Sequence, residues 1–470
     1  MRVTVFSCIA LPLMLLGLLA GSVSHAKGPL QVHPENPCWV VDRDDNAIFL
    51  TGSHTWAALQ ERGVEGETPD FDYQEYLEFL KKHDHNFIRL WAWEHAQWMQ
   101  FVGPDVPIRY TPNPYLRAGP GVALDGKPKF DVTRFNPRYF ERLRERVKAA
   151  GNRDIYVAVM LFQGFSLSKT RGDKSKGNAW HGHPFHSRNN INGIDGNPSG
   201  DDTGHEVHQL VIPEITTLQE AFVRKTIDTV GDLDNVLWEI CNESPGRTPE
   251  WQYHLIDVIK QYEADRPTQH LVGMTGTPNK VEVLMASSAD WISPNTLPFI
   301  NDPPANDGAK IRITDSDHCA PWDYDVLWPW KHLLRGNHFI LMDGYRDYRT
   351  GSGSPKKPLA EWDDCRDAMG QTRRLSQRID LASMRPQPKL ASTGYCLANE
   401  GAEYVALVPE DANGTLQMTL RPGKYSVQWM RLVRGRPKDG GSVRVDKGRH
   451  EFRPPWNGPA VLHLKKAKAQ

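Results

Sequence analysis

The chain has 470 residues, of which 39% are hydrophobic and 24% are charged, and these fractions exclude a fibrous or grossly disordered protein. The 56 Lys and Arg residues nearly balance the 57 Asp and Glu residues, giving a net charge of −1, so the charge does not favour nucleic acid or an anionic membrane as a partner. The 15 Trp, 14 Tyr and 16 Phe residues suit stacking on sugars, but Trp also packs well in cores, so their number alone decides nothing.

The first 26 residues have the layout of a secretory signal. Arg2 precedes an apolar run at residues 9–20, and a stretch of small residues then ends at Ala26, after which we expect cleavage. The apolar run is too short to span a bilayer comfortably, and no later run approaches the length required. We therefore expect an exported protein, periplasmic or secreted, that does not insert into the membrane once the signal is removed.

Between residues 47 and 380, short apolar runs alternate with segments of helical periodicity. The apolar runs predict strands at 48–53, 86–93, 155–162, 235–242, 270–275, 290–294, 310–315 and 338–343. The periodic segments predict helices at 73–83, 137–150, 218–230, 251–263 and 326–335. Asn136 followed by Pro137 is typical of an N-cap and a first helical position. Because parallel strands need helix-sized crossovers, the pattern predicts an α/β fold of the (β/α)8 TIM-barrel type, with a doubly wound open sheet as the alternative.

The segment 384–388 (Met-Arg-Pro-Gln-Pro) interrupts this alternation and is interpreted as a linker. After it, short alternating runs separated by Asn-Gly and Gly-Gly turns predict a small all-β sandwich. The predicted strands are 403–408, 416–420, 425–432, 442–445 and 460–464. We therefore expect a signal peptide at 1–26, a (β/α)8 domain at 27–383 and a C-terminal β-sandwich domain at 384–470.

Enzymes built on this barrel place their reacting groups at the carboxyl ends of the strands. The residues at these ends that we consider as candidates are His54, Trp56, Arg89, Trp93, Glu94, His95, Asn242, Glu243, Asp315, Asp317, His318 and Asp343. Hydrolysis of a glycosidic bond requires two carboxyl groups, one to protonate the leaving oxygen and one to attack the anomeric carbon or to activate water. Glu243 and the pair Asp315 and Asp317 follow strands four and seven, nearly opposite in such a barrel, and so predict this reaction.

The segment 238–245 (Trp-Glu-Ile-Cys-Asn-Glu-Ser-Pro) resembles the strand-four signature of clan A glycoside hydrolases, and 86–89 (Asn-Phe-Ile-Arg) resembles their second strand. The resemblance implies that Glu243 is the acid/base, that Asn242 binds a sugar hydroxyl and that Arg89 supports the nucleophile.

The clan carries Glu at the end of strand seven, where this sequence offers only Asp. Asp315 takes the clan position when the strand is aligned from Ile311, and Asp317 is the alternative on the same face. Asp is one methylene shorter than Glu, so the carboxyl separation stays open between about 5 Å, as in retaining enzymes, and about 6.5–9.5 Å, as in inverting ones.

Three further segments are similar to apiosidase-like bacterial hydrolases. They are 49–56 (Phe-Leu-Thr-Gly-Ser-His-Thr-Trp), 315–318 (Asp-Ser-Asp-His) and 334–343 (Leu-Arg-Gly-Asn-His-Phe-Ile-Leu-Met-Asp). That group often carries a C-terminal β-domain of the collagen-binding type, to which the tail from 423 to 462 has a general similarity. The resemblance implies a glycosidase whose partner is a glycan from a plant or bacterial polysaccharide.

The long segment 163–205 is rich in Gly, Asn, Asp and His, and connections of this length are often functional. His181 in it is a candidate sugar ligand, with loop packing as the alternative. Its histidine spacings lack the helical i, i+4 pattern of familiar zinc sites, so we expect neither a metal nor a cofactor. Trp322, like Trp93, is a candidate sugar platform near a strand end.

Some strand-end candidates also have structural interpretations. Glu239 is expected to form an ion pair, with Arg89 as its candidate partner. Asp343 could serve in a turn as well as at a sugar hydroxyl, and Asp315 or Asp317 could form an N-cap or an Asx-turn. At the level of the whole protein, the alternatives are a non-catalytic secreted carbohydrate- or protein-binding protein on a barrel scaffold and a metal-dependent hydrolase.

Overall fold

The computed structural model describes residues 26–64, 71–98, 107–167, 178–244, 249–276, 280–317, 325–343, 345, 362–409 and 414–467. The predicted signal peptide through residue 25 lies outside this range, as do the candidates His318 and Trp322. None of the helices within the described range is long and apolar enough to cross a membrane.

Eight parallel strands form one sheet in the order β4-β16-β15-β14-β13-β12-β11-β6. Their bounds are β4 (Thr51–His54), β6 (Phe87–Trp91), β11 (Tyr156–Gln163), β12 (Val236–Asn242), β13 (Val272–Thr275), β14 (Trp291–Ser293), β15 (Ile311–Asp315) and β16 (His338–Met342). The sheet closes between its end strands, where the backbone N–H of Asn86 donates to Thr51 O at 2.9 Å. Gly52 makes this closure possible, since a Cβ there would lie 1.9 Å from Phe87 O. The (β/α)8 prediction is confirmed, and the open sheet is not formed.

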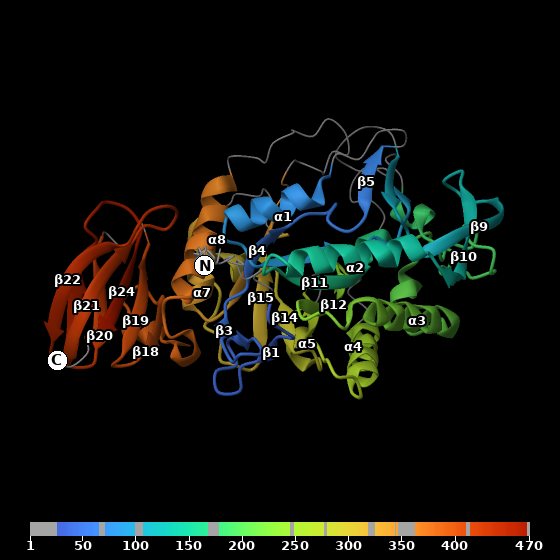
Figure 1. The fold of residues 1–470 in the computed structure, drawn as a ribbon. Coiled ribbons are helices and arrows are strands. Elements are labelled where there is room, and N and C mark those ends of the chain that lie inside the picture. The colour runs from blue at the N-terminus through green and yellow to red at the C-terminus, as the bar shows by residue number, and fades with distance from the viewer. Residues whose placement is uncertain are drawn as a thin grey trace, which may run out of the picture.

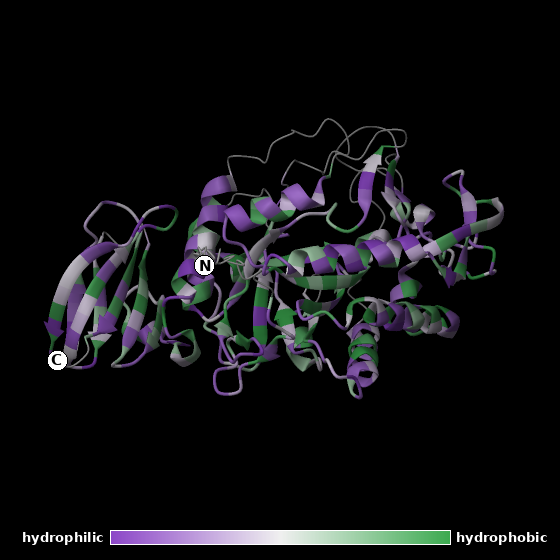
Figure 2. Cartoon of the chain, in the orientation of Figure 1, coloured by the Kyte–Doolittle hydropathy of each residue, from purple (hydrophilic) through white to green (hydrophobic). Residues whose placement is uncertain are grey.

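Helices cover the outside of the barrel (Figure 1). They are α1 (Tyr73–Lys82), α2 (Pro137–Gly151), α3 (Pro213–Val230), α4 (Pro249–Glu263), α5 (Val281–Ala286), α6 (Leu297–Asn301), α7 (Leu327–Leu334) and α8 (Asp363–Ser376). The Asn136 side chain caps α2 by accepting from the backbone N–H of Arg138 at 3.2 Å, as predicted. In Figure 2, α1 and α2 carry both hydrophilic and hydrophobic bands, as expected for helices that bury one face.

The sequence pattern did not predict α8, and its composition explains why. Its buried positions include Cys365, Ala368 and Gly370, which give a weak hydrophobic signal. Glycine also lowers helix propensity by about 1 kcal/mol. Gly370 nevertheless fits here because the helix packs tightly, so that a Cβ would lie 2.2 Å from His83 O.

The interior of the barrel is apolar at its amino-terminal end and charged further up. The apolar layer contains Leu50, Phe87, Tyr156, Leu237, Trp291, Ile311 and Ile340. Leu30 and Val40 join the same cluster, so the segment with β1 (Gln31–Val32), β2 (Val40–Val41) and β3 (Ala47–Ile48) covers that end. Two residues further along β6 the inward-facing residue is Arg89, which begins a polar layer.

Additional structure follows the carboxyl ends of β4, β6 and β11. A three-stranded sheet contains β5 (Glu61–Val64), β7 (Gln97–Trp98) and β8 (Ile108–Thr111), and a hairpin joins β9 (Tyr115–Val122) to β10 (Pro128–Phe135). The segment after β11 contains the short 3-10 helices η1 (Gly164–Leu167), η3 (Ala179–Gly182) and η4 (His205–His208). The hairpin holds that segment, since the Phe130 N–H donates to Asn189 O at 2.8 Å and the Ile191 N–H donates to Phe130 O at 2.9 Å.

The C-terminal strands form a six-stranded sheet and a two-stranded sheet. The first contains β17 (Arg385–Pro386), β18 (Cys396–Asn399), β19 (Glu403–Val408), β21 (Gly423–Met430), β22 (Lys438–Val445) and β24 (Ala460–Lys466), and the second contains β20 (Leu416–Leu420) and β23 (Gly448–Phe452). Met418 and Phe452 of the small sheet share one core with Tyr404 and Val427 of the large one. The predicted all-β sandwich is therefore present.

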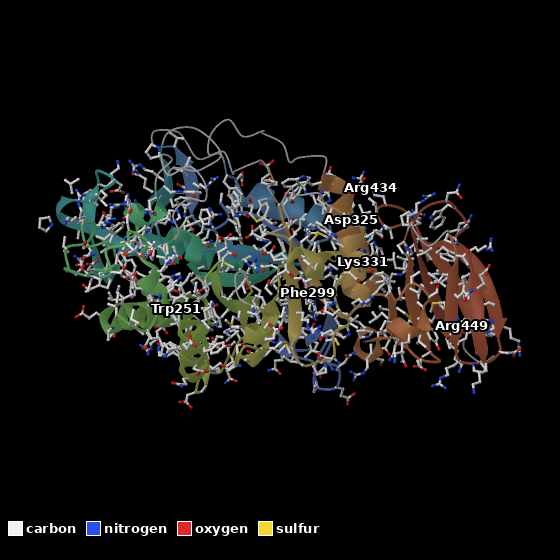
Figure 3. The ribbon with its side chains drawn as sticks, turned by 180° about the vertical axis from the view of Figure 1, so that it is seen from behind. Trp251, Phe299, Asp325, Lys331, Arg434 and Arg449 are labelled. Carbon is white, nitrogen blue, oxygen red and sulfur yellow. The ribbon has the colours of Figure 1, made fainter. Side chains whose placement is uncertain are left out.

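The sandwich packs on the barrel through a continuous apolar cluster. The segment predicted as a linker is part of this contact and does not separate the two parts. Trp330 of α7 is fully buried there, and its Nε1 donates to Leu432 O at 2.9 Å. The first residue of the predicted linker, Met384, is also fully buried, and its carbonyl accepts from Trp39 Nε1 at 3.1 Å. Figure 3 shows Lys331 of α7 at this junction, where its ammonium lies 5.6 Å from the ring centre of Tyr395.

Candidate active site

A buried charged layer lies inside the barrel above the apolar one. Arg89 of β6 donates from Nε and Nη2 to the two oxygens of Glu239 on β12, at 2.6 and 2.8 Å. Its Nη1 donates to Oδ2 of Asp315 on β15. All three side chains are fully buried. The predicted Arg89–Glu239 ion pair is therefore formed, and one guanidinium connects three strands of the barrel.

One cation between two carboxylates does not fully compensate their burial. Burial raises the pKa of Glu239, although Arg89 acts in the opposite direction. The hydroxyl of Thr275 donates to Glu239 Oε1 and supplies further stabilisation. Thr275 is a site residue that was not predicted, and the signal for it in the sequence is its position at the carboxyl end of predicted strand five.

Asp315 receives donors from several directions. His54 Nε2 lies 3.0 Å from its Oδ1, and the backbone N–H of Asp317 donates to the same oxygen at 3.1 Å. His54 Nδ1 accepts from the indole N–H of Trp91 at 2.9 Å. An indole N–H can only donate, so Nδ1 carries no proton and Nε2 must be the protonated nitrogen that donates to Asp315. These donors, with Arg89, favour the ionised carboxylate of Asp315.

Asp317 differs from Asp315 in exposure and in charge. Asp315 is fully buried, whereas Asp317 is half-buried. Burial, and then the charge of Asp315, raise the pKa of Asp317 to about 7, against the opposing effect of His54 and Arg89. The Asp317 N–H bond to Asp315 Oδ1 is that of an Asx-turn. Asp315 therefore shapes the turn that carries Asp317, and Asp317 can exchange a proton near neutral pH.

Glu243 follows the last residue of β12 and has an unusual backbone. Its φ is +45°, in the left-handed region that non-glycine residues rarely adopt. Such a conformation costs about 1–3 kcal/mol and persists only where its surroundings impose it. Gly164 is part of these surroundings, because a Cβ at that position would lie 2.1 Å from Glu243 O. The half-buried Glu243 side chain is thus aimed by a strained backbone packed against a glycine.

Asn242, next to Glu243, retains unused hydrogen-bonding capacity. Its Nδ2 donates to Gln163 Oε1 at 3.1 Å. Neither Asn242 Oδ1 nor Gln163 Nε2 has a hydrogen-bond partner among the described residues, and both side chains are buried. A buried polar atom without a partner is destabilising unless a ligand or water satisfies it. Gln163 directly follows predicted strand three and was missed.

Glu94 is placed in a network of histidines. Its carboxylate accepts from His208 Nε2 at 3.0 Å, from the Gln163 N–H at 2.8 Å and from His183 Nε2 at 3.3 Å. Burial alone would raise the pKa of Glu94, but His208 and His183 outweigh it and hold the pKa below its usual value. Glu94 therefore binds the segment after β11 to the end of β6.

His208 extends this network toward Glu243. Its ring stacks on Trp251 of α4, with ring centres 4.2 Å apart, and Trp251 is labelled in Figure 3. Its Nδ1 lies 3.8 Å from Cys241 Sγ. Burial raises the pKa of the Cys241 thiol well above its usual value, so the thiol keeps its one proton, which it can donate to Asn242 O at 3.2 Å or to His208 Nδ1. The network thus reaches the strand end that carries Asn242 and Glu243.

The other predicted site residues lie in varied surroundings. Asp343 accepts from Arg366 Nη2 and Nε at 2.6 and 2.7 Å in a fully buried pair, and it also accepts from the Tyr345 N–H, in agreement with the turn interpretation. His95 is buried next to Ser166 Oγ at 2.6 Å, and burial lowers its pKa to about 3, so it is neutral. His181 lies in η3 and is half-exposed.

The two aromatic candidates in the described range differ in exposure. Trp93 is only 4% exposed, stacks on Trp91 with ring centres 6.0 Å apart, and donates from Nε1 to Trp56 O at 3.0 Å. Trp56 is half-buried and lies 5.6 Å from the guanidinium of Arg62. Trp56 is therefore the more exposed of the two rings.

Comparisons with known proteins agree with this architecture. A family model described as "Domain of unknown function (DUF6298)" matches residues 83–290. No curated protein sequence matches the chain. A solved structure described as a glycoside hydrolase superposes with a TM-score of 0.60 at 13% identity, covering 94% of this chain and 98% of the other. A glycoside hydrolase family 5 structure from Bacteroides vulgatus gives a TM-score of 0.59 at 13% identity, with 93% of each chain covered. The chain shares the fold of these glycoside hydrolases.

The histidine network around Glu94 predicts a stability effect. Replacing Glu94 with Gln removes the charge and turns an acceptor into a donor toward histidine N–H groups, so we expect the free energy of unfolding to fall by about 1–3 kcal/mol. Urea denaturation followed by circular dichroism measures this change. The matched control is E220Q, because Glu220 binds His254 and Arg224 at the surface and should lose only about 0–1 kcal/mol. Equal losses in the two variants would contradict a special role for Glu94.

Proposed function

We propose that the protein is an exported glycoside hydrolase that cleaves a glycosidic bond in a plant or bacterial polysaccharide or oligosaccharide with two carboxyl groups. The observation that carries this proposal is the position of two half-buried carboxyl groups. Glu243 directly follows β12, and Asp317 lies two residues after the end of β15. Strands β13 and β14 separate these two strands in the sheet, so the carboxyls come from nearly opposite sides of the barrel mouth. The fold shared with solved glycoside hydrolases supports the same function.

In this proposal Glu243 protonates the leaving oxygen and Asp317 is the second carboxylate. The sequence alone favours Asp315 for the second role, but its complete burial argues that it does not touch a sugar. Asp315 instead holds the turn on which Asp317 sits, and its negative charge adds to the larger effect of burial in raising the pKa of Asp317. Asn242 is well suited to bind a sugar hydroxyl through its unused Oδ1, and Trp56 to stack on a ring.

Finer parts of the proposal rest on sequence resemblance. We place the chain with clan A and its apiosidase-like hydrolases, with a barrel domain at 27–383 and a collagen-binding-type domain at 384–470. Export follows from the signal pattern of residues 1–26. A secreted carbohydrate- or protein-binding protein on the same barrel is the competing function, and it requires no turnover dependent on Glu243.

The acid role of Glu243 is tested by replacement with Gln, which keeps the shape but removes the exchangeable proton. We expect turnover of glycans to fall by about 10²–10⁴-fold, the usual contribution of general acid catalysis. The measurement is a glycan library screen with identification of the released sugar. E250Q, which changes an exposed glutamate on α4, serves as the control. Equal turnover by E243Q and the wild type would overturn the assignment.

The aspartate pair predicts a pH dependence. Asp317 acts in its ionised form, so kcat/KM should rise with pH through a midpoint near 7, where its pKa lies. Replacing Asp315 with Asn removes the like charge and should lower the pKa of Asp317, which moves the midpoint to lower pH. The pH–rate profiles of the wild type and D315N give both midpoints. A midpoint that stays in place or rises in D315N would show that the two carboxyls do not interact as proposed.

Gly164 provides a test of Glu243 positioning that changes no charge. A Cβ at residue 164 would collide with Glu243 O, so G164A should displace the strained backbone of Glu243. A displacement of about 1 Å at a catalytic group can lower the rate about a hundredfold, and we expect kcat to fall by about that factor. The control is G63A, since nothing lies within 4 Å of a Cβ at Gly63. If G164A kept full kcat with an unchanged melting temperature, the close packing of Gly164 would have no bearing on Glu243.

A further inference from the structure

Three side chains with metal-binding atoms meet in the segment after β11. His181, His186 and Asp202 each offer one ligand atom, and these atoms all lie within 4.8 Å of one another. His181 Nε2 is 2.7 Å from Asp202 Oδ1. Two imidazoles and one carboxylate form a donor set suited to divalent transition metals, Zn²⁺ among them.

The backbone around His181 and Asp202 is fixed by a single asparagine. The Asn178 side chain caps η3, which carries His181, by accepting from the Trp180 N–H at 3.1 Å. Its Nδ2 donates to Asp202 O at 2.8 Å and to Asp202 Oδ2 at 3.2 Å. One residue therefore holds both turns, and it bonds the ligating carboxylate in the way that outer-shell groups orient metal ligands.

His186 is held with one nitrogen available. Its Nδ1 accepts from the Arg188 N–H at 3.2 Å, which leaves Nε2 to act as a ligand. Asn189 fixes the intervening turn by donating from Nδ2 to His181 O at 2.8 Å and to His183 O at 2.9 Å. The buried ring of Trp180 packs on His186, with ring centres 5.4 Å apart. The donors are thus oriented by protein contacts that do not depend on an ion.

A surface ion pair is the simpler interpretation of His181 and Asp202, which are both half-exposed. Such a pair contributes about 0–1 kcal/mol, and it does not require a second imidazole converging on the same point. A surface ion pair does not explain why His186 lies beside it, or why Asn178 and Asn189 hold the two turns with hydrogen bonds.

We propose that His181, His186 and Asp202 bind one divalent transition-metal ion, with Zn²⁺ as the expected metal, and that the ion fastens η3 to the turn at 201–204. This replaces the expectation of no metal and assigns His181 to the ion rather than to a sugar. The same segment carries His183 and His208, the partners of Glu94, so the ion would stiffen the segment that anchors the end of β6. Asp202 lies far from His186 in the sequence, so the site has no metal-binding sequence motif and could not be predicted from residue spacing.

The test uses the untagged full-length protein after dialysis against a chelator. We expect calorimetric titration with Zn²⁺ to show one equivalent bound with micromolar or tighter affinity. Titration with Co²⁺ should give the visible absorption of a nitrogen- and oxygen-ligated ion. H186Q and D202N should each weaken Zn²⁺ binding by at least about tenfold, and Zn²⁺ should raise the melting temperature of the wild type more than that of H186Q or D202N.

The control variant is H205Q, which changes a half-buried histidine of the same segment outside the cluster and should bind Zn²⁺ like the wild type. Circular dichroism establishes that each variant is folded before its affinity is compared. The proposal is overturned if the wild type shows no saturable Zn²⁺ or Co²⁺ binding, a result that needs no variant. It is equally overturned if folded H186Q and D202N bind Zn²⁺ as tightly as the wild type.

Discussion

The candidate site depends on the ion pairs that the buried guanidinium of Arg89 forms with two carboxylates. The guanidinium donates to Glu239 and Asp315 from the centre of the barrel, where no solvent reaches any of the three. Burying a charge is costly, and removing one partner of a buried pair typically destabilises a protein by about 3–5 kcal/mol. Because the three residues belong to β6, β12 and β15, the sheet must close before these charges can be satisfied. The same closure brings the carboxyl ends of β12 and β15 around one mouth.

Above this layer the positions of the two half-buried carboxyls, those of Glu243 and Asp317, are set by local backbone geometry. Asp315 accepts the Asp317 N–H and so determines the turn after β15. On the other side, Glu243 occupies a left-handed conformation that Gly164 accommodates. The histidine network around Glu94 adds a second level of support, since it reaches Cys241 and Gln163 on either side of Asn242. The positions of Glu243, Asp317 and Asn242 are therefore determined together by ion pairs, backbone strain and hydrogen bonds.

The strands were predictable because parallel strands buried on both faces form continuous apolar runs. The Arg89–Glu239 pair was predictable for a related reason, since both residues are polar interruptions of such runs. Helix α8 was missed because its buried positions are small and include Gly370. The β9–β10 hairpin was missed because its first strand contains Gly119 and Pro120, which ordinarily signal a turn.

The assignment of roles within the site could not be read from the sequence, because it depends on partners far away in the chain. Glu94, a predicted sugar ligand, has its partner His208 in a distant part of the chain, and Asp343 pairs with Arg366 of the unpredicted helix. The difference in burial between Asp315 and Asp317, on which we base our proposal for the second carboxylate, is not reported by any spacing rule.

The most direct measurement is a crystal structure of the E243Q variant with a bound oligosaccharide. The side chains at positions 243 and 317 should flank one glycosidic oxygen, with the carboxamide carbon of residue 243 and the carboxyl carbon of Asp317 about 5–9.5 Å apart, the range that spans retaining and inverting enzymes. A sugar bound at the C-terminal sandwich instead of the barrel mouth would contradict the two-carboxylate mechanism. So would a separation well beyond the inverting range of about 9.5 Å.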